Sequence, residues 1–215
     1  MLRYFVFALP AAFALLALTV TALPTDTSGS NICCQGDQVN FTALSENGTS
    51  AGGKGIRSSI NAKVNLDFIN KRLSSKGVMI VNDESGSTTI NFWVITKSDK
   101  TISINEAQKM CIEIPLIWYP KLCVPSTAQK VGSFVYGPVG QTFQTDAYKF
   151  INGDSDFFAT VTSDCTFINL VQANSSPVGG SLISSVMADF NPAVDESSFV
   201  LPPYCKESLG STVVG

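Results

Sequence analysis

The sequence predicts a single all-β domain made of antiparallel strands. Residues 60–68 alternate strictly between apolar and polar side chains, which is typical of a strand with one solvent-exposed face and one buried face. Polar pairs such as Ser98-Asp99 and Ser163-Asp164 separate consecutive strand signals, and connections this short join antiparallel neighbours. No helical periodicity extends beyond about two turns. These three observations favour a β-sandwich or a half-open barrel.

Strand signals continue at short intervals after residues 60–68. Further strands are expected at residues 78–81, 88–97, 101–105, 111–114, 133–136, 141–145, 157–162, 165–171 and 182–187. The best candidates for short helices are residues 147–151 and 193–198.

One predicted strand carries apolar side chains on both of its faces. Phe92-Trp93-Val94-Ile95 has no polar face, so we expect this strand to be covered on both sides or to line a cavity. Similar two-sided apolar runs occur at residues 114–119 and 157–158. Ligand sites are mostly apolar clefts with few polar groups. The residues expected to line such a pocket are Phe92, Trp93, Val94, Trp118 and Phe158.

The N-terminus indicates a secreted protein. A basic start ending at Arg3, an apolar run at residues 4–18 and small residues at Val20 and Ala22 predict a signal peptide at residues 1–22. A membrane anchor is disfavoured, since the run is short for a bilayer and Pro10 interrupts it. We expect a polar leader at residues 23–31, one domain at residues 32–208, a flexible tail at residues 209–215 and no membrane-spanning segment in the mature protein.

Composition excludes several classes of protein. The 215 residues include no histidine, which excludes Ser-His-Asp and Cys-His hydrolases and His-ligated zinc or haem sites. The net charge of −3, with scattered basic residues, argues against a nucleic-acid surface. Only 14% of the residues are charged, against about a quarter in typical proteins. Solubility must therefore have another source.

The cysteines and the N-glycosylation sequons are consistent with an extracellular protein. The 6 cysteines predict three disulfides in an oxidising compartment, and their spacing alone leaves every pairing open. Sequons at Asn40, Asn47 and Asn174 predict N-linked glycans. Such glycans would supply the solubility that side-chain charge does not.

The sequence gives only weak indications of a metal site or of catalysis. Asn152, Asp154 and Asp156 stand at alternate positions, as in calcium loops. Phe157 and Ser163 occupy the places where an EF-hand has Gly and Glu, so a polar turn is the preferred interpretation and calcium the alternative. Two carboxylates could still carry glycoside hydrolysis, but nothing in the sequence places a pair together. We predict no enzyme activity, and no cofactor other than calcium is considered.

Several short motifs are distributed along the chain, and their order allows a comparison with a known family. They are Cys34-Gln35-Gly36-Asp37-Gln38-Val39, residues 105–111 leading to Trp118 and Pro125, Tyr136-Gly137, Thr162-Ser163-Asp164-Cys165, and an end running from Asp189-Phe190 through Phe199-Val200-Leu201-Pro202-Pro203-Tyr204-Cys205. Together they span nearly the whole mature chain. In order and spacing the sequence resembles the ependymin-related proteins, which are secreted glycoproteins of similar length.

This resemblance implies a fold and a function. It implies two stacked antiparallel sheets forming a half-open sandwich or barrel around an apolar pocket, similar to bacterial lipoprotein-carrier folds, with one or two short helices. Such proteins are thought to bind fatty acids or other lipids, are often dimeric, and are associated with calcium and cell-matrix contact. We therefore expect a secreted, non-enzymatic homodimer that binds a hydrophobic ligand. The alternative is an extracellular matrix or adhesion glycoprotein with calcium-dependent contacts.

The resemblance also suggests how the cysteines pair. It implies disulfides between Cys34 and Cys165 and between Cys111 and Cys205. Cys33 and Cys123 are then left over, and we expect them to pair with each other. Adjacent cysteines in an extended segment point to opposite sides, so separate partners for Cys33 and Cys34 are geometrically reasonable.

Overall fold

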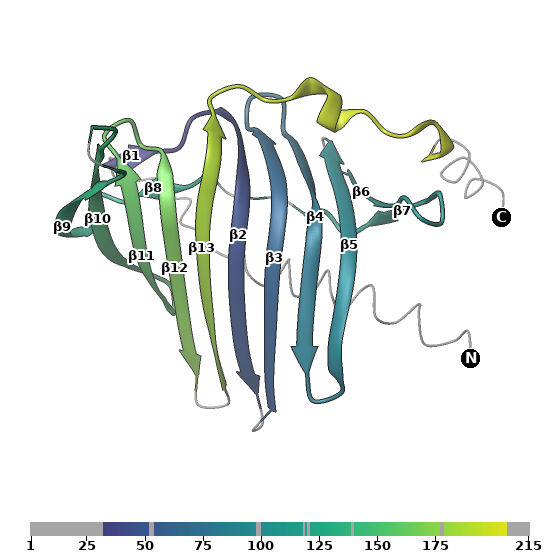
Figure 1. Ribbon diagram of the computed structural model, residues 1–215, viewed down its shortest axis with the longest axis horizontal. Coiled ribbons are helices and arrows are strands. Elements are labelled where there is room, and N and C mark those ends of the chain that lie inside the picture. The colour runs from purple at the N-terminus through teal and green to yellow at the C-terminus, as the bar shows by residue number, and fades with distance from the viewer. Residues whose placement is uncertain are drawn as a thin grey trace.

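The structure of the chain, a computed structural model, describes residues 32–51, 54–97, 100–117, 119, 121–138, 140–176 and 179–205 (Figure 1). The expected signal peptide, polar leader and C-terminal tail lie outside these residues. Within the described part, no helix is long and apolar enough to span a membrane.

Thirteen strands and one short 3-10 helix make up the described fold. They are β1 (Cys33–Cys34), β2 (Gln38–Ala51), β3 (Lys54–Asp67), β4 (Arg72–Asp83), β5 (Gly86–Lys97), β6 (Lys100–Asn105), β7 (Met110–Ile114), β8 (Cys123–Val124), β9 (Gln129–Tyr136), β10 (Phe143–Asn152), β11 (Ser155–Thr162), β12 (Phe167–Ser176), β13 (Gly179–Asn191) and η1 (Glu196–Phe199).

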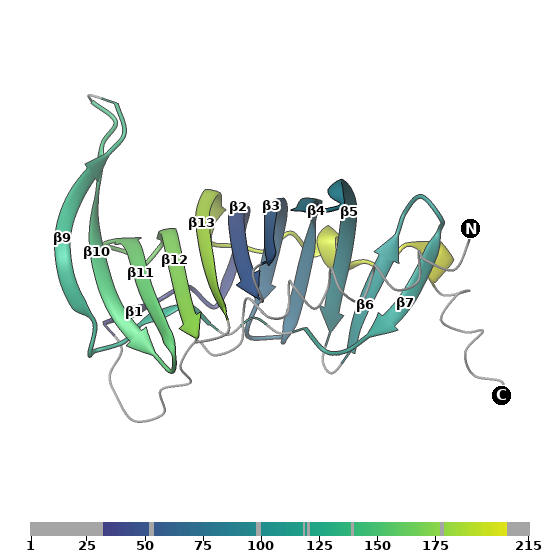
Figure 2. The ribbon, with the colours of Figure 1, turned by 90° about the horizontal axis from the view of Figure 1, so that it is seen from below.

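All strand pairs are antiparallel, and the two sheets differ greatly in size. An 11-stranded sheet has the order β7-β6-β5-β4-β3-β2-β13-β12-β11-β10-β9, and β1 and β8 form a 2-stranded sheet. The large sheet consists of two meanders, β2 to β7 and β9 to β13, joined where β13 pairs with β2 (Figures 1 and 2). The expected all-β fold with two antiparallel sheets is confirmed.

Several details differ from the expectation. β2 was not predicted, because its second half places Ser45, Asn47 and Thr49 where a typical strand has apolar residues. The helix expected at residues 147–151 is instead part of β10, which pairs on both sides. The helix expected at residues 193–198 is η1, whose Asp195 accepts a hydrogen bond from the backbone N–H of Ser197 as an N-cap.

The connection between the two meanders crosses the whole sheet. β7 and β9 are the two edge strands, and residues 115–128 join them; we call this segment the strap. Eleven flat strands would be roughly 48 Å wide, and the strap could reach about 50 Å only if fully extended. It contains a turn in which Ala128 N–H donates to Pro125 O, so it is not fully extended. The sheet must therefore bow toward the strap.

Antiparallel register assigns each side chain of the sheet to one of two faces. We call inner the face of one row of paired residues, namely Met187, Ala43, Ala62, Gly77 and Phe92. The next row lies on the outer face and consists of Ala188, Thr42, Lys63, Lys76 and Trp93. At Gly77 a Cβ would collide with the carbonyl of Asn61, so β3 and β4 approach closely only with glycine there.

The main core lies on the inner face and is covered by strap residues. Its buried members include Phe41, Val64, Leu66, Leu73, Met79, Phe92, Val94, Phe150, Phe157, Val161 and Phe167. Val124, Leu122 and Tyr119 of the strap pack against this cluster. Burial raises the pKa of the Tyr119 phenol to about 12, so it is neutral at physiological pH.

A second, smaller core lies on the outer face, beneath the C-terminal segment. Ile95, Ile102 and Ile104 are buried there with the cysteines Cys111 and Cys205. Trp93, Leu201 and Tyr204 pack around them. The two-sided apolar run at residues 92–95 is therefore covered on both sides, as expected.

The C-terminal segment is held on the outer face by an ionic cluster centred on one buried carboxylate. Asp67, at the end of β3, is fully buried and accepts hydrogen bonds from Asn70 and Arg72. The Arg72 guanidinium also donates to Glu196 of η1, at 2.7 and 2.8 Å, and stacks over the Phe199 ring. Burial alone would raise the pKa of Asp67, but the hydrogen bonds from Asn70 and Arg72 hold it well below its usual range.

Asp67→Asn should destabilise the protein in a pH-dependent way. Losing the carboxylate leaves Arg72 partly unpaired, and breaking a buried pair costs about 3–5 kcal/mol at pH 7. The pKa of Asp67 is lowered on folding, so its contribution is present above the unfolded value near 4 and is lost progressively as the pH falls below it. Chemical denaturation between pH 7 and 2 should therefore show the wild type and the variant converging in acid.

Glu84→Gln serves as the control for this measurement. Its ion pair with Lys54 is exposed, with 63% of the Glu84 side chain accessible, so its loss should cost less than about 1 kcal/mol. An Asp67→Asn curve parallel to the wild-type curve down to pH 2 would show that the carboxylate is not responsible.

Candidate functional site

The candidate site is the part of the inner face that continues beyond the strap. Leu170 of β12, Ile60 of β3, Met79 of β4 and Ile90 of β5 belong to one inner row, together with two serines. Met79 is buried, whereas Leu170, Ile60 and Ile90 are only partly buried and pack against the main core. This row offers an apolar surface that a ligand could cover.

The five residues expected to line a pocket do not lie together. Phe92 and Val94 lie on the inner face, buried in the main core at 6% and 4% exposure. Trp93 and Phe158 lie on the outer face, because their row partners are Lys76 and Val171. Trp118 lies outside the described residues. Strand alternation explains the split, since adjacent residues of one strand cannot both face the same cavity.

At the β5–β6 end, two buried threonines anchor the strap. Thr96 and Thr101 are both fully buried, and their hydroxyl oxygens lie 2.8 Å apart. The Thr96 hydroxyl donates to the carbonyl of Ile117, and the Ile117 N–H donates to Thr101 Oγ1. The remaining hydroxyl proton of Thr101 can bond Thr96 Oγ1, so every polar group of this anchor is satisfied.

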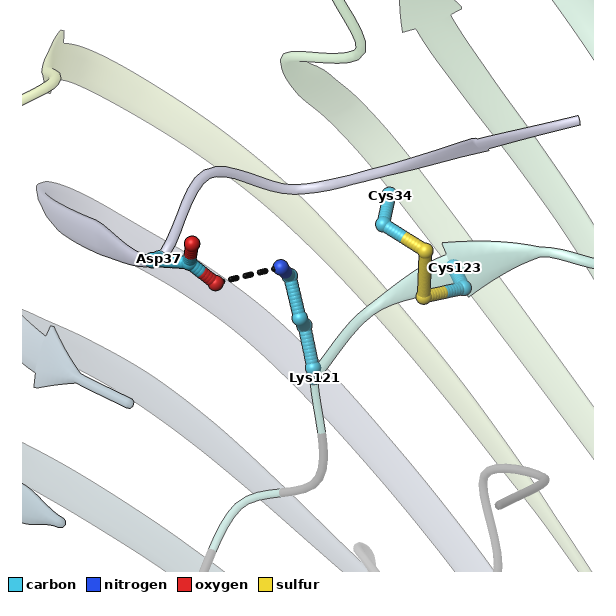
Figure 3. Close-up of a disulfide and its surroundings, with 4 residues drawn as sticks. All are labelled: Cys34, Asp37, Lys121 and Cys123. Carbon is cyan, nitrogen blue, oxygen red and sulfur yellow. Dashed lines mark hydrogen bonds and ion pairs between the residues drawn. A yellow bond between two sulfur atoms is a disulfide. The ribbon is translucent and has the colours of Figure 1, made fainter. Parts of the chain in front are cut away.

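At the other end, the strap pairs with β1 to form a clamp. Ile32 N–H donates to Val124 O and Gln35 N–H to Leu122 O, both at 2.8 Å. Cys34 stands directly opposite Cys123 in this ribbon, and a disulfide joins them (Figure 3). The Lys121 ammonium lies 2.6 Å from the Asp37 carboxylate beside the disulfide (Figure 3). One covalent bond and one ion pair thus hold the strap to the segment that leads into β2.

The disulfide pairing corrects two expectations. The structure joins Cys34 to Cys123, so the expected pairs Cys34–Cys165 and Cys33–Cys123 are wrong. The reason is the β1–β8 register, which sets Cys34 against Cys123 and Cys33 against Val124. A shift of one residue exchanges the two sides of a strand, and the sequence could not specify this register. The second disulfide joins Cys111 and Cys205, the pair that the resemblance implied.

Two buried amides have side-chain polar atoms without hydrogen-bond partners. Gln35 is 1% exposed beside the strap, and neither of its side-chain amide atoms is bonded. Asn47, on the inner face of β2, is 4% exposed with its Oδ1 unbonded. A buried polar group without a partner costs about 1–3 kcal/mol, so such groups call for a partner from outside the chain.

The expected calcium residues lie around the β10–β11 turn. Asn152 pairs with Ser155 across a tight hairpin in which Gly153 has a φ of 56°. Asp156 pairs with Ile151, so its side chain lies on the opposite face from Asn152, and Asp154 is at the exposed tip. The structure does not bring these three residues together. Among the described residues no cluster of three or more Cys, Asp or Glu side chains could hold a metal ion.

A polar groove opens between the β9–β10 edge and the β11–β12 turn. Its volume is about 670 Å³, and Lys130, Asp146, Thr162 and Asp164 are among the residues that line it. Hydrogen bonds from Lys130 and Ser133 lower the pKa of Asp146, and one from Thr162 lowers that of Asp164. Both carboxylates are already engaged by neighbouring side chains, which does not favour either as a proton-transfer group.

The three sequons differ in accessibility. Asn174 of β12 is exposed. Asn40 is half-buried, and its Nδ2, the atom to which a glycan attaches, donates to Ala193 O at 2.6 Å. Asn47 is buried on the inner face. A glycan at Asn47 is therefore incompatible with the packing of β2.

The geometry defines an antiparallel β protein whose one large sheet is crossed by a disulfide-clamped strap over an apolar face. A family model described as "Ependymin domain, amoebozoa" matches residues 33–212. The chain therefore belongs to the ependymin family, which confirms the resemblance seen in the sequence. A comparison with curated proteins gives no match to this chain.

Two solved structures show weak similarity. An uncharacterized conserved protein from Thermus thermophilus is 8% identical, with a TM-score of 0.41 over 78% of this chain and 87% of that chain. A structure of MucB in complex with MucA(peri) is also 8% identical, with a TM-score of 0.14 over 72% of this chain and 94% of that chain.

Thr96→Val should loosen the strap at its threonine anchor. The substitution keeps the shape but leaves the Ile117 carbonyl without its donor, which costs about 1–3 kcal/mol. Hydrogen exchange should show faster exchange of the Ile117 amide. Thr88→Val, at an exposed position on the same face of β5, should leave both stability and exchange unchanged. Equal effects of the two substitutions would contradict the anchor.

Glycan occupancy should follow the accessibility of the three sequons. In protein secreted from a eukaryotic host, Asn174→Gln should remove one glycan, whereas Asn47→Gln should leave the glycan mass unchanged. Glycosidase treatment followed by peptide mass spectrometry checks both. High occupancy at Asn47 would show that β2 is packed differently from the arrangement described above.

Proposed function

We propose that this chain is a secreted, non-enzymatic glycoprotein that binds a fatty acid or another lipid on the inner face of its large sheet. Secretion is supported by the signal-like N-terminus, the two disulfides and membership of a family of secreted glycoproteins. A homodimer is the oligomeric state expected from the family resemblance.

The observation that carries this proposal is the partly exposed apolar row on the inner face. Leu170, Ile60 and Ile90 lie on one face of one continuous sheet, and the strap covers the neighbouring part of that face. A partly covered apolar surface beside a covalently held strap is a suitable place for an acyl chain. Each methylene group buried there would contribute about 0.8 kcal/mol.

A lipid also has a polar end that needs hydrogen bonds. The Gln35 amide is buried beside the strap with both of its polar atoms unpaired. An amide can donate to a carboxylate and accept from a hydroxyl, so it suits the head group of a fatty acid or fatty alcohol. Binding would then relieve the cost of leaving this amide unsatisfied.

Binding is tested by titrating the secreted, disulfide-bonded protein with dansyl-labelled undecanoic acid. We expect saturable binding that Ile90→Asn weakens about tenfold, because a polar amide replaces an apolar contact of about 1.4 kcal/mol. Unfolding midpoints measured in parallel show whether each variant is folded.

Ile80→Asn is the matched control. Ile80 belongs to the neighbouring strand but faces outward and is 39% exposed, so its substitution should change affinity less than about twofold. Absence of saturable binding by the wild type, or equal losses in the two variants, would refute binding on the inner face.

A further inference from the structure

Two cysteines remain outside the two disulfides, and their thiols are in contact. Cys33 and Cys165 are both free and partly buried, and their side chains form a hydrogen bond. They belong to distant segments, since Cys33 lies in β1 and Cys165 in the turn between β11 and β12. Both ribbon views place β1 beside β11 (Figures 1 and 2).

Each thiol is held in place by the surrounding structure. Cys33 pairs with Val124 in the β1–β8 ribbon and packs against the main core. The turn that carries Cys165 is closed by Cys165 N–H donating to Thr162 O and by Thr162 N–H donating to Thr166 O, both at 3.0 Å. Cys165 has a φ of 65°, a left-handed conformation that this turn imposes. The two thiols are already within hydrogen-bonding reach of each other, and a disulfide requires their sulfur atoms to approach to about 2.05 Å.

We propose that Cys33 and Cys165 form the third disulfide of the secreted protein. With it, the neighbouring residues Cys33 and Cys34 bridge two different parts of the fold. Cys34 holds β1 to the strap, and Cys33 holds β1 to the β11–β12 turn of the large sheet. The strap is thereby linked covalently, through β1, to the sheet that it crosses.

The reaction is two steps of thiol–disulfide exchange with an oxidised dithiol oxidoreductase. The Cys165 thiolate attacks one sulfur of the donor's disulfide, which forms a mixed disulfide and releases the donor's other sulfur as a thiolate. Cys33 then loses its proton to solvent and attacks Cys165 Sγ, releasing the donor's second thiolate. Two protein thiols are oxidised to one disulfide, and one donor disulfide is reduced to two thiols.

The environment of Cys33 supports this order of attack. Burial, the hydrogen bond to Cys165 and the charge of Asp164 raise the pKa of Cys33 to about 12. Cys33 is therefore a thiol at neutral pH and a poor initial nucleophile, since the thiolate is the attacking species.

The test counts free thiols in the full chain secreted from eukaryotic cells. The protein is denatured without reductant, treated with a maleimide and analysed by mass spectrometry. We expect no maleimide adduct and a crosslinked peptide containing Cys33 and Cys165, with fragmentation between residues 33 and 34 separating the two linkages. Two adducts, at Cys33 and Cys165, or a linkage of either residue to another cysteine, would overturn the proposal.

The thiol count above depends on the proposed secretion of the protein. A second experiment, with purified protein, does not. The Cys34→Ser/Cys123→Ser variant is purified reduced and oxidised with glutathione disulfide. The Cys33–Cys165 crosslink should still form. Adding Cys33→Ser to this variant should leave Cys165 without a protein partner, so that it is recovered as a free thiol or as its mixed disulfide with glutathione. If the purified wild type also yields no Cys33–Cys165 crosslink under these conditions, the geometry of the two thiols is wrong, whatever compartment the protein occupies.

Discussion

The constraint on which the rest of this structure depends is that one connection must join the two opposite edges of a single sheet. β7 and β9 are edge strands, and only residues 115–128 lie between them. A short connection across a wide sheet cannot avoid one of its faces. It therefore decides which face becomes the interior, bows the sheet, and places Tyr119, Leu122 and Val124 over the apolar side chains.

The strap would detach easily if packing alone held it, because an extended segment leaves its backbone groups without partners. The chain provides partners at both ends. Thr96 and Thr101 satisfy the backbone of Ile117, and the β1–β8 ribbon satisfies that of Leu122 and Val124. On the opposite face, Arg72 and Asp67 hold η1, so that β5 is buried from both sides by two segments with separate anchors.

Much of this fold could be predicted from the sequence, and the reasons for success and failure are physical. The alternation at residues 60–68 and the two-sided run at residues 92–95 reflect burial directly, and both predictions agree with β3 and β5. β2 loses such a pattern after Ala43, and its place beside β13 depends on long-range pairing. The site was harder to predict, because Trp93 and Phe158 are apolar yet face outward, and because one residue of register exchanges the roles of Cys33 and Cys34.

The outward position of Trp93 has a consequence for spectroscopy. Its indole packs against the outer-face core, which Leu201 and Tyr204 of the C-terminal segment also cover, and the Lys76 ammonium lies 4.4 Å from its ring centre. The sheet itself separates this indole from the apolar inner face. The emission of Trp93 therefore reports whether the C-terminal segment is seated, and a change in intrinsic fluorescence on adding a lipid would have to come from another chromophore or from motion transmitted through the sheet.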